Sequence, residues 1–117
     1  RGKGLVIDNP NAPRKVGAMT PAQAAERVQA GTLTIVDVRP ADERAMATAP
    51  VAHRSFDEGV ETFEALPKDT PLAFLCRSGG RSAQAAEHFR ALGFKDLYNI
   101  EGGINAWALL DPNLRAY

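Results

Sequence analysis

The stretch LAFLCRSGGRSAQAAEHFRALGF, residues 72–94, decides the fold class of this chain. Its apolar run over residues 72–76 predicts a buried strand that ends on Cys76, the only cysteine. Residues 82–92 then carry apolar side chains at threefold spacing, which predicts an amphipathic helix: Ala83, Ala86, Phe89 and Leu92. Gly93 is a typical helix end. A buried strand followed at once by a helix is the unit from which parallel α/β sheets are built.

Strands and helices alternate on both sides of this unit. Residues 33–38, LTIVDV, are apolar and β-branched, which predicts a strand buried on both faces and therefore parallel to its neighbours. Residues 97–100, LYNI, predict a third strand. Helices are expected over residues 21–30, 40–47, 59–66 and 104–110, and an edge strand around Val51. The alternation predicts an α/β domain with a mainly parallel sheet.

The length and composition predict one folded domain of ordinary size. The 117 residues are 44% hydrophobic and 24% charged, which is a usual globular balance. Residues 1–18, rich in Pro and Asn, are expected to be an irregular lead-in or linker, and residues 19–117 the domain. Since no initiator Met is present, we expect an excised piece or one domain of a longer protein.

Charge and cysteine content exclude several function classes. Fourteen basic residues balance fourteen acidic ones, so no overall field favours nucleic acid or a membrane surface. One cysteine makes neither an internal disulfide nor a cysteine-rich zinc site, and no metal site is expected. A lone thiol suits a reducing compartment, and the first residues lack the apolar core of a signal peptide. We therefore expect a cytoplasmic protein.

Five residues join the strand to the helix after the cysteine: Arg77, Ser78, Gly79, Gly80 and Arg81. The glycines let successive amides converge on one point, and the following helix adds its positive end. Both arginines add positive charge, so the pKa of Cys76 is expected to lie below that of an ordinary thiol. Ser78 is a candidate donor to a bound oxyanion, whereas Ser82 is expected to be a cap or turn residue.

A lone cysteine at a strand end is more often a core residue than a nucleophile. Here the arginines change that interpretation, because they sit at the unfavourable end of the helix dipole. This local cost makes sense if an anion occupies the loop.

The sequence CRSGGR resembles the rhodanese homology domain when read with DVR at 37–39 and GFKDLYNIEGGINAW at 93–107. The resemblance implies a five-stranded parallel sheet with helices on both faces. It also implies a sulfurtransferase that carries sulfane sulfur as a persulfide on Cys76, with residues 77–81 as the substrate cradle. The family's remaining motif residues are expected to support the fold and the loop: Asp37, Arg39, Gly102, Gly103 and Trp107.

The implied enzyme is a thiosulfate sulfurtransferase without a cofactor. Its donor would be a small anion such as thiosulfate, and its acceptor a thiol or a protein. The lead-in also resembles the stretch before the rhodanese domain in some bacterial monothiol glutaredoxin fusions, which implies a fused glutaredoxin domain as a further partner.

Other functions stay open at this point. The chain could be a non-catalytic module that binds an anion or a partner, a redox sensor, or a phosphatase or arsenate reductase that uses the same thiolate. The loop has six positions, one fewer than in the related cell-cycle phosphatases, which argues against phosphate. The family's usual Gly-His-Ile is replaced here by ATAPVAHRSF, which leaves the substrate-side wall at residues 49–56 undefined. We expect His53 to be a surface or capping residue rather than a general base.

Overall fold

The computed structural model describes residues 16–114 of the chain. All strand pairs in these residues are parallel, and the sheet order is β1-β5-β4-β2-β3. The strands are β1 (Gly17–Met19), β2 (Thr34–Asp37), β3 (Arg54–Ser55), β4 (Leu72–Leu75) and β5 (Leu97–Ile100). The helices are α1 (Pro21–Gln29), α2 (Ala41–Met46), α3 (Val60–Glu64), α4 (Gly80–Ala91) and α5 (Gly103–Trp107), with a 3₁₀ turn η1 (Phe56–Glu58). This confirms the predicted α/β class and the five-stranded parallel sheet.

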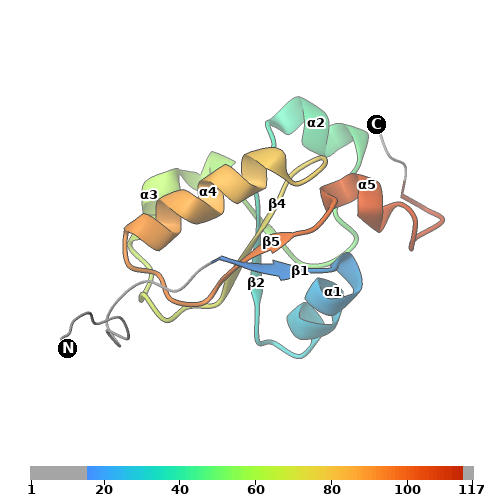
Figure 1. Cartoon of the computed structure of the whole chain (residues 1–117). Coiled ribbons are helices and arrows are strands. Elements are labelled where there is room, and N and C mark those ends of the chain that lie inside the picture. Colours follow the sequence, from blue (N-terminus) through green and yellow to red (C-terminus); the bar gives the residue numbers. More distant parts are fainter. Residues whose placement is uncertain (1–15, 115–117) are drawn as a thin grey trace.

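Helices cover both faces of the sheet, as predicted, with α3 and α4 on one face and α1 and α5 on the other (Figure 1). The fully buried strand β4 explains this arrangement, because successive side chains of a strand point to opposite faces. Leu72 and Phe74 pack with Phe89 of α4, whereas Ala73 and Leu75 pack with Ile104 of α5. A strand between two helical layers therefore needs a continuous apolar run, which is what the sequence supplies.

The first helix follows its predicted boundaries closely. Thr20 is the N-cap of α1, and its side chain accepts a hydrogen bond from the Gln23 amide at 3.2 Å. The Gln23 side chain accepts a hydrogen bond from the Thr20 amide at 3.0 Å, which completes the predicted capping box.

Two edge strands differ from the prediction. The sequence predicts irregular structure up to residue 18, but Gly17–Met19 forms β1 and pairs with β5. Gly17 lies opposite Tyr98, and a Cβ there would be 3.0 Å from the tyrosine ring, so glycine makes room for the ring. The other edge strand, β3, lies at Arg54–Ser55 rather than around Val51. Both are short strands defined by pairing with distant residues, which local composition does not reveal.

The carboxyl ends of β2, β4 and β5 meet at one edge of the sheet, as parallel strands must. The segments that leave this edge lead into α2, α4 and α5 respectively (Figure 1). Clefts for ligands in open α/β sheets form at such an edge. Among the helices of residues 16–114, none combines the length and apolar character that a membrane span requires.

Candidate functional site

Cys76 is the first residue after β4, at the carboxyl edge of the sheet. We call residues 76–81 the Cys76 loop. The amide of Gly79 donates a hydrogen bond to the cysteine sulfur at 3.1 Å, and the sulfur lies 3.2 Å from the hydroxyl oxygen of Ser82. Gly79 has φ +108°, which an L-residue rarely adopts, so glycine is what lets the loop turn its amide onto the sulfur. The glycine turn thus faces the thiol.

The Cys76 sulfur is buried beneath the loop rather than exposed at its surface. Cys76 is 1% exposed, whereas four of the loop residues around it are exposed, Arg77, Ser78, Gly80 and Arg81, and Gly79 is half-buried. The atoms nearest the sulfur are nevertheless polar. This combination of low exposure and hydrogen-bond donors differs from a thiol packed in hydrocarbon, which is the usual environment of a core cysteine.

The surroundings lower the pKa of Cys76 below the ordinary thiol value, in the predicted direction. Burial raises the pKa, because it penalises the charged thiolate. The Ser82 hydroxyl and the backbone amides of Ser82, Gly79 and Ser78 together lower it by more. The thiolate is the nucleophilic form of cysteine, so the loop favours the reactive state.

Ser82 contributes more than the sequence suggests. The sequence predicts a cap or turn residue, but α4 starts two residues earlier, with Gly79 at its N-cap, and Ser82 lies fully buried inside the helix. Its hydroxyl donates a hydrogen bond of 2.5 Å to the side-chain oxygen of Asn99 on β5. The Asn99 side-chain amide in turn donates to the carbonyl of Gly79 at 3.1 Å. A chain of hydrogen bonds therefore connects the Cys76 sulfur through Ser82 to Asn99 on β5, and from Asn99 back to the Cys76 loop.

Sequence reasoning missed Asn99 entirely. Asparagine is depleted in strands, so an Asn inside the predicted strand LYNI was the only local signal. Its partners lie 17 and 20 residues away along the chain, so only the fold brings them together.

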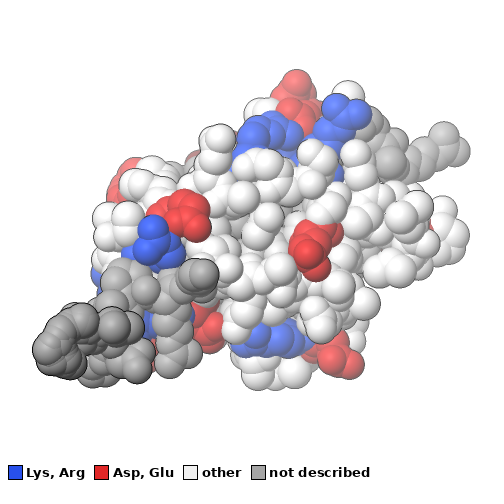
Figure 2. All heavy atoms as spheres, viewed as in Figure 1, with Lys and Arg blue, Asp and Glu red and all other residues white. Residues whose placement is uncertain are grey.

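The two loop arginines lie at the exposed rim. The Arg81 guanidinium makes a two-pronged ion pair with Glu43 of α2, with N–O distances of 2.9 and 2.7 Å. Figure 2 shows basic and acidic side chains close together at the end of the molecule where α2 and the start of α4 lie, and interspersed charges elsewhere on this face. Arg81 thus ties α2 to the Cys76 loop, and a bound anion would share its guanidinium with Glu43.

The turn between β5 and α5 holds the Cys76 loop from behind. The Ile104 amide donates to the carbonyl of Cys76 at 2.9 Å, and the Asn105 amide donates to the carbonyl of Arg77 at 3.0 Å. Gly102 and Gly103, with φ +72° and +56°, form this turn. A Cβ on Gly103 would lie 2.2 Å from the Cys76 carbonyl oxygen, so only glycine permits this approach.

Asp37 and Arg39 form a buried ion pair beside the site. Both side chains are fully buried, and the guanidinium lies 2.7 Å from the Asp37 carboxylate. Arg39 also donates to the carbonyl of Ala47 at 2.7 Å, which fixes the chain just after α2. The pair therefore positions α2, the helix that supplies Glu43.

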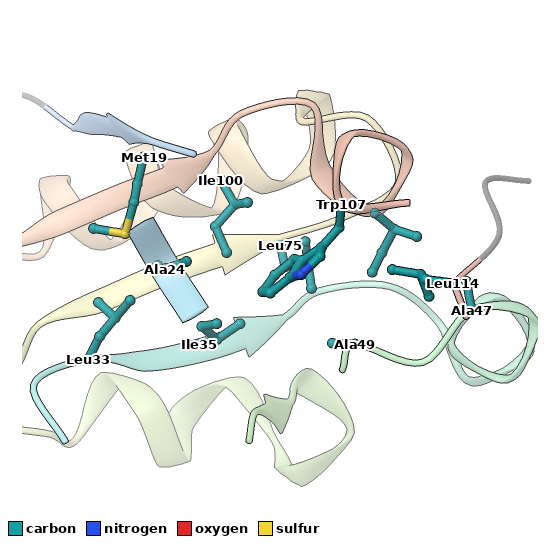
Figure 3. Close-up of a cluster of buried hydrophobic side chains, with 12 residues drawn as sticks. Met19, Ala24, Leu33, Ile35, Ala47, Ala49, Leu75, Ile100, Trp107 and Leu114 are labelled. Atoms are coloured by element: carbon teal, nitrogen blue, oxygen red, sulfur yellow. The ribbon is translucent and has the colours of Figure 1, made fainter. Parts of the chain in front are cut away.

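Trp107 supports β4 near its end. Figure 3 shows its indole beside Leu75, the residue before Cys76, in a cluster that also holds Ile35 and Ile100. Trp107 is 4% exposed, so the ring fills the core on the α1 and α5 face of the sheet.

His53 does not join the sulfur site. Its ring nitrogen Nδ1 lies 2.8 Å from the carbonyl oxygen of Val51. With the start of β2 it lines a hollow of about 250 Å³ to which Cys76 does not contribute. That His53 is not a general base stays a prediction.

Comparisons with known proteins agree with this fold. Residues 20–110 match the family model described as rhodanese-like domain. The putative sulfurtransferase YtwF of Bacillus subtilis is 35% identical over 80% of this chain and 91% of its own length. The probable adenylyltransferase/sulfurtransferase MoeZ of Mycobacterium tuberculosis is 29% identical over 97% of this chain, which spans only 30% of MoeZ.

A solved structure adds to these sequence matches. The polysulfide-sulfur transferase of Wolinella succinogenes has a TM-score of 0.63 and 28% identity, over 87% of this chain and 78% of that one. The five-stranded parallel sheet, the loop that folds around Cys76 and these matches lead to one conclusion: the chain belongs to the rhodanese-like domain family.

Proposed function

We propose that this domain is a sulfurtransferase that carries sulfane sulfur as a persulfide on Cys76. The main support is the environment of the Cys76 sulfur. The thiol is buried, accepts a hydrogen bond from the Gly79 amide, lies beside the Ser82 hydroxyl and has a lowered pKa. A thiolate held by fixed donors is the nucleophile that such a reaction needs. The names of the relatives, as sulfurtransferases, support the same class of activity.

The first step is attack of the Cys76 thiolate on the outer sulfur of thiosulfate. A sulfur–sulfur bond forms to Cys76, and the sulfur–sulfur bond of thiosulfate breaks. The bonding electron pair leaves with sulfite. One negative charge stays on the outer sulfur of the new persulfide, and the exposed Arg77 and Arg81 at the rim offset charge on the donor and on the departing sulfite.

In the second step an acceptor nucleophile attacks the outer sulfur. The persulfide bond breaks, its electron pair returns to Cys76, and the thiolate is restored. Cyanide takes the sulfur away as thiocyanate in this step. The cellular acceptor we propose is a thiol, either small or on a protein. The expectation of a fused glutaredoxin domain rests on residues 1–16, of which residues 1–15 lie outside the described residues, and it stays a prediction.

The shape of the loop supports a small sulfur donor. Cys76 is 1% exposed, so a donor must place a single terminal atom into the loop floor. A persulfide adds one sulfur atom there, whereas a phosphoryl group needs space for three oxygens. The amides of Ser78, Gly79 and Ser82 already act on the sulfur, which leaves a narrow ring for the added atom.

The test is intact-protein mass spectrometry after brief exposure to thiosulfate. The expected result is a mass gain of one sulfur atom that cyanide removes, with no gain in Cys76→Ser. Because the chain has a single cysteine, any gain is assigned to Cys76 without further mapping. No mass gain over a range of pH and donor concentration would refute the proposal.

The same variants separate the alternatives. A non-catalytic module would show neither a persulfide nor thiocyanate formation while still binding an anion. A phosphatase would hydrolyse an aryl phosphate, and Cys76→Ser would abolish that hydrolysis. The proposal expects no such hydrolysis.

A further inference from the structure

The side chain of Asn99 can be oriented from its partners alone. One of its polar atoms faces the carbonyl oxygen of Gly79 at 3.1 Å, and a carbonyl only accepts hydrogen bonds. That atom must therefore be the amide nitrogen. The other atom, 2.5 Å from Ser82, must then be the amide oxygen, which also only accepts.

With Asn99 in this orientation, the hydroxyl proton of Ser82 must point toward the Asn99 oxygen. A serine hydroxyl has one proton, and Ser82 satisfies the Asn99 oxygen only by donating that proton to it. Toward the Cys76 sulfur, 3.2 Å away, the Ser82 oxygen is then an acceptor. It accepts from a protonated thiol, whereas a thiolate would need the same proton for itself.

We propose that Asn99 is a positioning residue that competes with the Cys76 sulfur for the single hydroxyl proton of Ser82. In the thiol form, Cys76 donates to Ser82 and Ser82 donates to Asn99. When Cys76 ionises, the Ser82 hydroxyl rotates toward the sulfur and the Asn99 oxygen loses its donor. Asn99 thereby limits how far Ser82 stabilises the thiolate.

The competition also fits the proposed sulfur transfer, and this step rests on that function. In the persulfide the negative charge lies on the outer sulfur, and the Cys76 sulfur is neutral. The Ser82 proton then returns to Asn99. When an acceptor removes the outer sulfur, charge returns to Cys76 and the hydroxyl rotates back. Asn99 thus keeps the Cys76 thiolate from becoming too stable to attack a donor, since nucleophilicity falls as the thiol pKa falls.

The charged residues near Cys76, Ser82 and Asn99 are not altered by the substitutions that test this proposal. They lie on the loop, on α2, at the end of β2 and after β5: Arg77, Arg81, Glu43, Asp37, Arg39 and Glu101. Residues 103–107 of α5 include no charged side chain. Substitutions at Ser82 and Asn99 leave these charges in place, so a shift of the Cys76 pKa in the variants does not come from a change of charge.

The test is a double-mutant cycle read by the pH dependence of Cys76 alkylation with iodoacetamide. The four proteins are the native chain, Asn99→Ala, Ser82→Ala and the double variant. With Ser82 present, Asn99→Ala frees the hydroxyl and moves the alkylation midpoint to lower pH. At a pH below the midpoint this raises the alkylation rate about fivefold, which corresponds to one neutral hydrogen bond. With Ala at position 82, the same substitution leaves the midpoint unchanged.

A purely structural role gives a different pattern. If Asn99 acts only by holding the Gly79 carbonyl, its loss shifts the midpoint equally in both backgrounds. Equal shifts, no shift with Ser82 present, or a shift to higher pH would each overturn the proposal. Asn99→Leu, which keeps the number and branching of the side-chain heavy atoms, replaces Asn99→Ala if the smaller side chain lowers the melting temperature. Alkylation of Cys76 does not require sulfur transfer. If the four proteins show the predicted alkylation midpoints but thiosulfate forms no persulfide, the proposed function is refuted and the role of Asn99 still holds.

Discussion

Replacing Gly103 by alanine tests whether the turn after β5 sets the geometry of the Cys76 loop. The added Cβ would lie 2.2 Å from the Cys76 carbonyl oxygen and 2.7 Å from the Arg77 carbonyl carbon and oxygen. These are backbone atoms, so no rotamer change relieves the overlap. The loop and the turn must separate by at least about 1 Å to reach ordinary van der Waals contact.

The cost can be worked from the contacts that are lost. An alanine at φ +56° carries a strain of about 1–2 kcal/mol. Separation also breaks the two bonds from the Ile104 and Asn105 amides to the loop carbonyls, at about 1 kcal/mol each. We therefore expect Gly103→Ala to lower the free energy of unfolding by about 3–4 kcal/mol. A loop displaced by about 1 Å should also load sulfur about 100-fold more slowly.

Gly31→Ala is the matched control. Gly31 has φ +77°, but nothing lies within 4 Å of the position that a Cβ would take there, so alanine would carry the strain without the overlap. Urea unfolding should place Gly103→Ala about 2 kcal/mol below Gly31→Ala, and only the former should load slowly. Equal stability and equal loading rates in the two variants would contradict this role for Gly103.

Three further predictions concern the core and the thiol. Asp37→Asn leaves the buried Arg39 without its counter-charge and should lower the free energy of unfolding in urea by about 3–5 kcal/mol. The control Asp57→Asn, in the exposed pair with Arg44, should change that free energy little. Similar losses of stability in the two variants would contradict the burial of the Asp37–Arg39 pair. Trp107→Ala should cost about 3–5 kcal/mol by leaving a cavity beside Leu75, and a change under about 1 kcal/mol would contradict its core role. The pKa of Cys76 is lower in the folded protein than in the unfolded chain, so the unfolded chain binds more protons at a pH between the two values. The native chain should therefore gain stability relative to Cys76→Ala as the pH rises through that window. A gain in stability as the pH falls would contradict the lowered pKa.

Local sequence signals were enough for the elements that build the centre of the domain. The apolar runs predicted β2 and β4, LYNI matched β5 at both ends, and the Thr20 capping box fixed the start of α1. These features depend on residues within a few positions of one another. The edge strands β1 and β3 depend instead on pairing with distant strands, and their positions were missed or displaced.

The site divides in the same way. The loop composition predicted the direction of the Cys76 pKa and the glycine turn that faces the sulfur. It did not predict the bonds from Ser82 to Asn99 or from Arg81 to Glu43, which join residues 17 and 38 positions apart. Such contacts require the strand order, and a propensity rule assigned Ser82 to a cap because serine is usually found there.

The pH dependence of Cys76 alkylation tests most directly whether the folded loop favours the thiolate, on which the proposed sulfur transfer depends. The chain has one cysteine, so the same protein in urea gives the unperturbed reference. We predict that the folded protein reaches half-maximal alkylation rate at a lower pH than the chain in urea. A folded midpoint equal to or above the midpoint in urea would show that the loop does not stabilise the thiolate.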